Sequence, residues 1–322
     1  MSEQFFSLTP DLILDVVERA ALVRATGRTL ALNSMENRVY ELELEDGSRI
    51  VTKFYRPGRW TAEQILEEHA FVADLAANEV PAVAPLPLSN GSTLERSDDG
   101  IFFAVFPKTR GRILQELDDS RLQQVGRLLG RLHNVGAAKK AAHRLALTPD
   151  TYGWRSLELL ASSPLLDAQA GPRYRAAAER VLRACEAVFT RVAARQLRLH
   201  GDCHLGNVLW QDTGPFFLDF DDMVTGPAVQ DVWLVVRGRD EEAQRSREVL
   251  LRSYETMREF DRSELALIEP LRALRIIHYS AWIARRWEDP TFRHAFPDFG
   301  SQRYWFEELA TLEEQADLIT GT

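Results

Sequence analysis

Cysteine is scarce in this sequence of 322 residues, which contains only Cys185 and Cys203. Two cysteines cannot build the disulfide framework of a small secreted domain, and so low a number is typical of proteins in a reducing compartment. The N-terminal segment also lacks the basic start, the apolar stretch and the small-residue cleavage site of a signal peptide. We therefore expect a cytoplasmic protein.

An excess of positive charge and a long apolar run are missing as well. The net charge is −9, whereas proteins that bind duplex nucleic acid over a broad face usually carry the opposite bias, so we expect no nucleic-acid partner. No stretch approaches the roughly 18 uninterrupted apolar residues of a membrane span, so we expect no membrane partner. Apolar residues make up 45% and charged residues 27%, which is ordinary for a globular protein with a buried core.

The first part of the chain has the pattern of β-strands. Apolar and acidic residues alternate over 40–45 up to Asp46-Gly47, a typical hairpin turn, and the return strand over 50–55 carries Lys53. The nearly continuous apolar run over 101–106 predicts a buried central strand that ends at Pro107.

Helical periodicity marks the remaining segments. One helix is predicted from Thr9 and Pro10 onward, others over 121–135 and 171–196, and one over 61–79 whose inward side is Ile65, Leu66, His69, Val72 and Leu75. From residue 108 on, helical patterns dominate. We therefore predict an α+β fold with two lobes, residues 1–107 and 108–322, and a ligand site in the cleft between them.

The stretch RLHGDCHLGNVLW (198–210) carries most of the polar chemistry, together with FFLDFDD (216–222). Residues 207–210 and 214–220 resemble two short strands joined by a turn, which would return Asp219 to the side of Asn207. One carboxylate and one amide oxygen suit Mg²⁺, which completes its shell with water and phosphate oxygens. Asp202, five residues before Asn207, is then free to orient a hydroxyl group and accept its proton.

Other interpretations of this stretch are weaker. A zinc site at His200, Cys203 and His204 would need a fourth ligand, and no second Cys/His pair lies at a suitable distance. Redox chemistry at Cys203 lacks a partner cysteine nearby in sequence. Taken alone, Asp202 is as readily a turn acid, and its spacing to Asn207 and Asp219 is what favours catalysis. We expect His200 to pack and to hydrogen-bond the loop backbone.

The pattern HGDxxxxN followed by an aspartate on the next strand resembles the catalytic loop of the aminoglycoside-phosphotransferase-like kinases. The resemblance extends over nearly the whole chain to the bacterial stress response kinase A family of serine/threonine protein kinases. The segments that carry it are NSMENRVY (33–40), VTKFYRPGRWTAEQILEEH (51–69), HGDCHLGNVLW (200–210), LDFDD (218–222) and GPAVQDVW (226–233). It implies a two-lobed protein-kinase-like fold, with a small antiparallel-sheet lobe that binds nucleotide and a mainly helical lobe that binds the acceptor.

The resemblance also implies a role for each matching residue. Asp202 would be the catalytic base, and Asn207 and Asp219 would hold Mg²⁺, with Asp221 and Asp222 as alternatives for the second ligand. The remaining roles concern ATP: Ser34 near the phosphates, Lys53 on the α- and β-phosphates, Glu68 (alternatively Glu67) as the partner of Lys53, and Phe106 within the segment 105–108 that meets the adenine. Asp231 would brace the catalytic loop.

The loop that would cover the phosphates, LNSMENRVY, contains no glycine, so Ser34 together with Asn33 or Asn37 would have to supply donors through their side chains. The activity implied is ATP- and Mg²⁺-dependent transfer of phosphate to Ser or Thr of a protein, with autophosphorylation, by a monomer under stress conditions. Two alternatives stay open: a kinase for small molecules such as aminoglycosides, homoserine or choline, and a nucleotide-binding regulator without turnover.

The C-terminal segment RIIHYSAWIARRWEDPTFRHAFP (275–297) permits two interpretations. Arg285, Arg286 and Arg293 would either line the acceptor side of the cleft or lie on the surface. The segment KTRGR (108–112) would either contact an acidic substrate or cover the linker. We expect the tryptophans at 233, 282, 287 and 305 to belong to the core.

Overall fold

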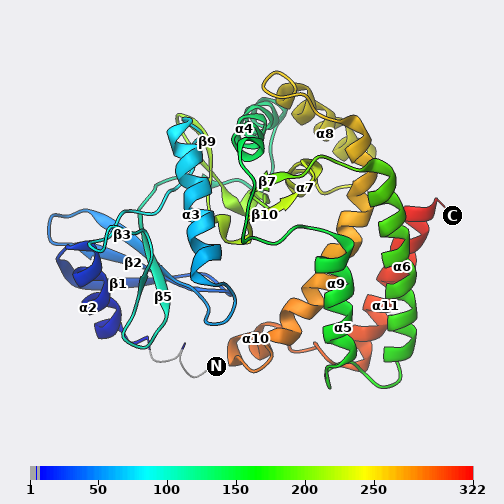
Figure 1. The fold of residues 1–322 in the computed structure, drawn as a ribbon, viewed down its shortest axis with the longest axis horizontal. Helices are drawn as coiled ribbons and strands as arrows, with labels where there is room; N and C mark the ends of the chain where they lie inside the picture. The colour runs from blue at the N-terminus through cyan, green and yellow to red at the C-terminus, as the bar shows by residue number, and fades with distance from the viewer. Residues whose placement is uncertain (1–4, 6–7, 322) are drawn as a thin grey trace.

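The structure is a computed structural model that describes residue 5 and residues 8–321. A sheet with two helices forms the small lobe, and a mostly helical part forms the large lobe (Figure 1). This arrangement confirms the predicted two-lobed α+β fold. None of the described helices is long and apolar enough to cross a membrane.

The sheet of the small lobe has five antiparallel strands in the order β1-β2-β3-β5-β4. The turn between the second and third strands is the predicted one, and Gly47 takes the left-handed φ of +81° that favours glycine. β5 is not the central strand that we predicted. It is fourth in the order, and the two residues of β4 pair along its outer edge. The strands are β1 (Ala25–Leu32), β2 (Arg38–Leu44), β3 (Arg49–Phe54), β4 (Glu95–Arg96) and β5 (Phe102–Pro107).

Two helices accompany this sheet. α2 (Pro10–Ala21) is capped by Thr9 as predicted and packs Val16 and Val17 on the sheet. α3 (Ala62–Ala77) begins with a capping box of Thr61 and Gln64 and stands between the sheet and the large lobe (Figure 1). Its predicted inward side is wrong at Leu66, which is 39% exposed, because Ile65, Glu68, His69 and Val72 already complete the buried stripe.

Small sheets at the base of the cleft carry the polar stretch singled out above. β8 (Val208–Gln211) and β9 (Gly214–Phe217) form a hairpin whose outer partner is β6 (Arg112–Ile113). β7 (Leu197–Leu199) pairs with β10 (Val224–Gly226), so the two ends of the stretch are fixed by one antiparallel ladder.

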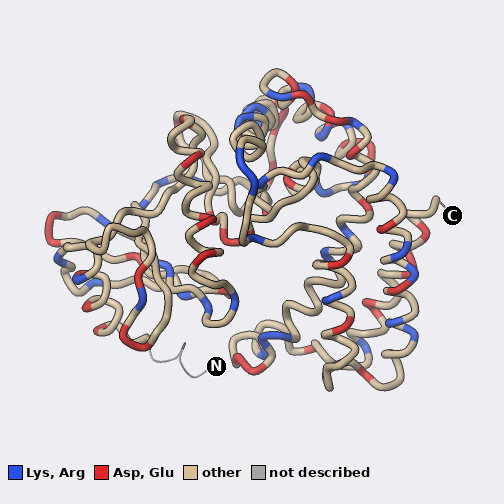
Figure 2. Tube along the Cα trace, viewed as in Figure 1, with Lys and Arg blue, Asp and Glu red and all other residues tan. Residues whose placement is uncertain are grey.

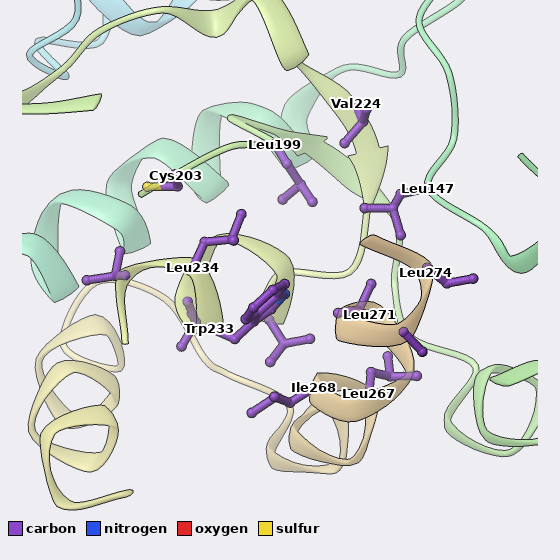
Figure 3. Packing of buried hydrophobic residues seen from close by; sticks show 14 of the residues in the cluster. Leu147, Leu199, Cys203, Val224, Trp233, Leu234, Leu267, Ile268, Leu271 and Leu274 are labelled. Carbon is purple, nitrogen blue, oxygen red and sulfur yellow. The ribbon is translucent and has the colours of Figure 1, made fainter. Parts of the chain in front are cut away.

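The large lobe packs its helices around one apolar core. Figure 3 shows part of it, where Leu199 of β7, Val224 of β10, Trp233 of α7 and Leu271 of α9 come together. The helices are α4 (Asp119–Ala138), α5 (Arg155–Ala161), α6 (Gly171–Val192), α7 (Val229–Val235), α8 (Glu241–Tyr254), α9 (Ile268–Arg285), α10 (Pro290–Ala295) and α11 (Gln302–Thr320).

The four tryptophans of this lobe divide into two groups. Trp233 and Trp305 are buried in the core, as expected. Trp282 and Trp287 are only partly buried at its edge, and Trp282 also lines the cleft. The expectation for Trp282 is therefore incomplete, because this residue joins the core to the ligand site.

The contact between α4 and α8 depends on a helical glycine. A Cβ atom at Gly126 would lie 2.2 Å from the Leu250 carbonyl oxygen, so neither backbone can keep its place. We expect Gly126→Ala to lower the free energy of unfolding by about 1–3 kcal/mol, measured by urea denaturation. Gln123→Ala, on the exposed side of the same helix, is the control and should change it by less than about 0.5 kcal/mol. Equal effects of the two substitutions would contradict this packing.

Candidate active site between the lobes

A cleft of about 690 Å³ lies between the lobes. The seven residues predicted to form the site all line it: Ser34, Lys53, Glu68, Phe106, Asp202, Asn207 and Asp219. They come from both lobes, so the fold brings together side chains up to 185 positions apart, the separation of Ser34 from Asp219 (219 − 34).

The hairpin of β8 and β9 places Asn207 beside Asp219, as predicted from the spacing. Val208 pairs with Phe217, and the amide of Leu218 donates to the carbonyl of Asn207 at 2.9 Å. Asp219 then turns sharply, with a left-handed φ of +54°. This conformation costs a non-glycine residue about 1–3 kcal/mol and is typical of functional sites.

Asp231, in the first turn of α7, holds the start of the loop His200-Gly201-Asp202. Its buried carboxylate accepts from the amides of His200 and Gly201, both at 2.9 Å, and lies 3.1 Å from His133 Nε2. His200 in turn lies 2.8 Å from the carbonyl of Leu218. These contacts agree with the bracing role expected of Asp231 and the backbone contact expected of His200.

Gly201 is required by the same loop. Its φ is +86°, and a Cβ atom there would lie 2.0 Å from the carbonyl oxygen of Asp222. The glycine of HGD therefore lets the loop pass directly over the segment that follows Asp219.

Asp202 lies beyond Gly201 with its carboxylate in the cleft. Oδ1 is 2.9 Å from Arg275 Nη1, and Oδ2 is 3.4 Å from His204 Nε2. Burial disfavours ionisation, but the hydrogen bond from His204 and the charge of Arg275 hold the pKa of Asp202 well below its usual range. The side chain is therefore a carboxylate at neutral pH, able to accept a hydrogen bond from an acceptor hydroxyl.

Asn207 and Asp219 fit a hard cation with few protein ligands. The amide group of Asn207 donates to the carbonyl of Asp202 at 3.0 Å, which directs the nitrogen away and leaves the amide oxygen as a ligand. Nearby, Asp221 Oδ1 is buried without a hydrogen-bond partner among the described residues. No group of three or more His, Cys, Asp or Glu side chains in the described chain suits a metal. The oxygen donors of Asn207 and Asp219 would suit a hard divalent cation that keeps most of its ligands from water and phosphate.

Lys53 contacts these acids and not the predicted partner. Its Nζ is 2.8 Å from Asp219 and 3.4 Å from Asp221. Burial alone would lower the pKa of Lys53, but the two carboxylates raise it well above its usual value, so the ammonium is charged. The expected ion pair with Glu68 is not formed.

Glu68 pairs instead with a residue of the large lobe. Arg144 Nη2 lies 2.6 Å from its carboxylate, and both side chains are buried. The same guanidinium donates to the carbonyl of Asp221 at 2.9 Å and stacks on Trp60. The alternative, Glu67, does not meet Lys53 either, because it accepts from the backbone amides of residues 142–144.

The glycine-free loop before β2 is held by side chains. The amide of Asn37 donates to Ser34 Oγ at 3.3 Å, and Ser34 faces the cleft. Asn37 is 2% exposed and is committed to Asp221 and the amide of Arg56, so it does not offer the donor that we expected of it. Asn33 lines the cleft and is the remaining candidate.

Glu36 ties this loop to α9. Its carboxylate accepts from Trp282 Nε1 at 2.7 Å and from Arg286 at 2.9 Å. Arg286 therefore bridges the lobes, whereas Arg285 and Arg293 are exposed, and Arg293 pairs with Glu288. None of these three arginines is among the residues that line the cleft, so the first interpretation of the segment is not supported. No local sequence pattern predicts this link, because 246 positions separate Glu36 from Trp282.

A second arginine crosses the cleft beside the predicted metal ligands. Arg59, in the turn before α3, pairs with Asp221 and lies 2.5 Å from Asp222. Figure 2 shows acidic and basic segments meeting at the centre of the molecule, between α3 and β10. Asp221 and Asp222 are thereby engaged by arginine, which leaves Asp219 as the carboxylate that faces the cleft with the greater exposure, 54% of its side chain.

One side of α9 forms the far wall of the cleft. The lining residues recur at helical spacing: Leu271, Leu274, Arg275, His278, Tyr279 and Trp282. His278 stacks on Tyr152 at 4.3 Å between ring centroids. Burial, with the charges of Arg285 and Arg286, lowers the pKa of His278 to about 3, so the ring is neutral at physiological pH.

Comparison with known proteins agrees with this geometry. The model of the phosphotransferase enzyme family matches residues 27–268. Stress response kinase A of Escherichia coli K12 is 42% identical over 98% of this chain and 94% of its own length. The serine/threonine protein kinase RdoA of Salmonella typhimurium is 39% identical over the same shares. This chain belongs to the stress response kinase A family of phosphotransferases.

Solved structures share the fold at low identity. The amicoumacin kinase hAmiN, solved with AMP-PNP, Ca²⁺ and Ami, has a TM-score of 0.74 at 18% identity and covers 99% of this chain and 96% of its own. A microcompartment-associated aminopropanol kinase has a TM-score of 0.69 at 17% identity, with 97% of each chain covered. The kinase-like fold expected from the resemblance is thus confirmed for this member of the stress response kinase A family.

The Glu68–Arg144 ion pair, which forms instead of the predicted Glu68–Lys53 pair, can be tested by substitution. We expect Arg144→Met to lower the free energy of unfolding by about 3–5 kcal/mol, because it leaves Glu68 buried without its counter-ion. Adding Glu68→Met should restore part of that loss. Arg155→Met, which removes an exposed pair with Asp150, is the control and should cost less than about 1 kcal/mol. A similar loss for both single substitutions in urea denaturation would show that Glu68 does not depend on Arg144.

The low pKa of His278 predicts a pH dependence of stability. The unfolded histidine binds a proton near pH 6.5 and the folded one only near pH 3, so stability is fully present above 6.5 and falls as the pH drops between these values. The slope from one such group approaches about 1.4 kcal/mol per pH unit. We expect His278→Gln to flatten the curve of unfolding free energy between pH 6.5 and 4. Parallel curves for the two proteins would show that His278 takes up its proton without unfolding.

Proposed function

We propose that this protein is an ATP- and Mg²⁺-dependent kinase that phosphorylates Ser or Thr residues of proteins, itself included. The observation that carries the proposal is the convergence of Lys53, Asp202, Asn207 and Asp219 in one cleft of a chain that belongs to a phosphotransferase family. All four side chains needed for phosphoryl transfer are present, which argues against a nucleotide-binding regulator without turnover.

The nucleotide would lie under the sheet of the small lobe. Apolar side chains from both lobes line the cleft: Val39, Val51 and Phe106 come from the small lobe, and Leu209 and Leu218 come from the large lobe. Lys53 would exchange Asp219 for phosphate oxygens. Asn207 and Asp219 would hold Mg²⁺, which supplies charge neutralisation for the triphosphate when bound.

Asp202 would act on the acceptor. Its ionised carboxylate lies on the α9 side of Asn207, where a hydroxyl hydrogen-bonded to it would be aligned with the γ-phosphate. Because the transition state of phosphoryl transfer is loose, most of the acceleration would come from this positioning and from the neutralised charge.

A protein acceptor is favoured over a cationic small molecule by the charge of the far wall. An acidic wall would suit an aminoglycoside or an amino alcohol, but α9 presents the positive charge of Arg275 beside Asp202. The name of the Salmonella relative, a serine/threonine protein kinase, supports the same choice. The solved neighbours named for amicoumacin and aminopropanol keep a small-molecule acceptor as the alternative.

The test is phosphate transfer from γ-labelled ATP with Mg²⁺, a generic protein acceptor and a panel of small molecules. We expect label on protein, and a fall in kcat of at least about a hundredfold in Asp202→Ala, because general-base positioning contributes roughly 10²–10⁴. Unfolding curves of the variant verify that it is folded. Label only on a small molecule would overturn the protein-kinase proposal, and nucleotide binding without transfer to any acceptor would favour the regulator.

A further inference from the structure

Two exposed arginines near the acceptor half of the cleft lack carboxylate partners. Within residue 5 and residues 8–321, Arg237 and Arg285 have no carboxylate oxygen within 4 Å, and the one polar contact of the Arg237 side chain is the Leu234 carbonyl at 3.3 Å. Together with Arg275 we call them the acceptor-side arginines: Arg237, Arg275 and Arg285.

Helix α9 places two of them on one line. Arg275 belongs to the side of the helix that lines the cleft, and Trp282 lies seven residues further on that side. Arg285 follows Trp282 by three residues, so it lies about one turn beyond the lining residues on the same side of α9, where it is exposed. An extended segment laid along α9 would pass Arg275 next to Asp202 and then reach Arg285.

Arg237 is near enough to Asp202 and Arg275 for their charges to act on it. It follows α7, and burial lowers its pKa, as do the nearby charges of Arg275 and Arg272. Arg272 is compensated, because it lies 3.3 Å from Glu269 and stacks on Trp233. Arg237 is exposed and has no such acid, so positive charge accumulates beside the catalytic carboxylate in a chain whose net charge is −9.

Arg275 is the member that contacts the catalytic residue. It lies 2.9 Å from Asp202 Oδ1, while His204 lies 3.4 Å from the other oxygen, so both oxygens of the carboxylate are engaged. The Arg275 side chain is 41% exposed and can turn toward solvent. An acidic group at the mouth of the cleft would give it another partner and release Asp202 Oδ1 for the acceptor hydroxyl.

We propose that the acceptor-side arginines select acceptor segments in which acidic groups flank the Ser or Thr that is phosphorylated. The inference rests on the proposed function and names the substrate class of the same site. The flanking acid would bind through charge-assisted hydrogen bonds to guanidinium groups, the geometry for which arginine is suited. Because the whole chain is negative, selection would depend on these short-range contacts and would weaken with salt, as the Debye length is about 8 Å at physiological ionic strength.

The experiment measures binding and transfer separately on matched peptides. Each peptide carries one serine, flanked by Asp and Glu, by phosphoserine, by Lys and Arg, or by neutral residues. Binding is followed by fluorescence anisotropy of labelled peptide to the full chain with Mg²⁺ and a non-hydrolysable ATP analogue. Transfer is followed with γ-labelled ATP. The phosphoserine peptide distinguishes prior phosphorylation from ordinary acidic side chains as the source of the flanking charge.

We expect the acidic peptides to bind at least about tenfold more tightly than the basic one. The double variant Arg237→Glu/Arg285→Glu should abolish that preference, with KM for the acidic peptide rising and kcat on the neutral peptide unchanged. Arg275→Ala should also weaken binding of the acidic peptide in the anisotropy measurement. The control is the double variant Arg191→Glu/Arg195→Glu, the same charge change at exposed positions around the end of α6, and it should retain the preference.

The outcomes test the selection by arginine and the protein-kinase function separately. Equal or tighter binding of the basic peptide, or a preference that survives in the double variant, would overturn the inference even if serine is phosphorylated. Acidic binding that is lost in the double variant, without transfer to any peptide, would support the arginine selection and contradict the protein-kinase function.

Discussion

Several carboxylates lie close together at the base of one cleft. The rest of the site depends on the cations that keep these carboxylates ionised and in place. Asp202, Asp219 and Asp221 lie within a stretch of twenty residues that folds back on itself. Two unit charges 4 Å apart repel by about 4 kcal/mol at an effective dielectric constant of 20. In this protein each acid faces a cation: Arg275 faces Asp202, Lys53 faces Asp219, and Arg59 faces Asp221.

These cations also join the lobes. Lys53 and Arg59 belong to the small lobe and bind acids of the large lobe, while Arg144 of the large lobe binds Glu68 of α3. Glu36 adds a contact to α9 through Trp282 and Arg286. The ion pairs that compensate the acids therefore also hold the two lobes across the cleft. A bound nucleotide would take over Lys53, while the arginine contacts remain to hold the lobes.

Much of this could be predicted from sequence, because the information is local. The HGDxxxxN spacing, the following hairpin and the alternation around Asp46-Gly47 each specify a short segment. The structure places all seven predicted site residues in the cleft. The predictions that were wrong concern residues whose partners are distant in sequence. Glu68 pairs with Arg144, 76 positions away, instead of with Lys53. The side-chain amide of Asn37 donates to Asp221, 184 positions away. Leu66 was wrong for a related reason, since the polar residue Glu68 takes a place in the buried stripe that apolar periodicity alone would assign to leucine.

The most direct test of this account is the dependence of nucleotide binding on a divalent cation, measured by titration calorimetry with AMP-PNP. The paired acids are proposed to hold the nucleotide through a metal at Asn207 and Asp219. The account predicts binding with Mg²⁺ that weakens strongly when a chelator is added, and an Asp219→Ala variant in which Mg²⁺ no longer strengthens binding. Equal affinity with and without Mg²⁺ in the natural sequence would contradict it, because the acids would then serve only to join the lobes.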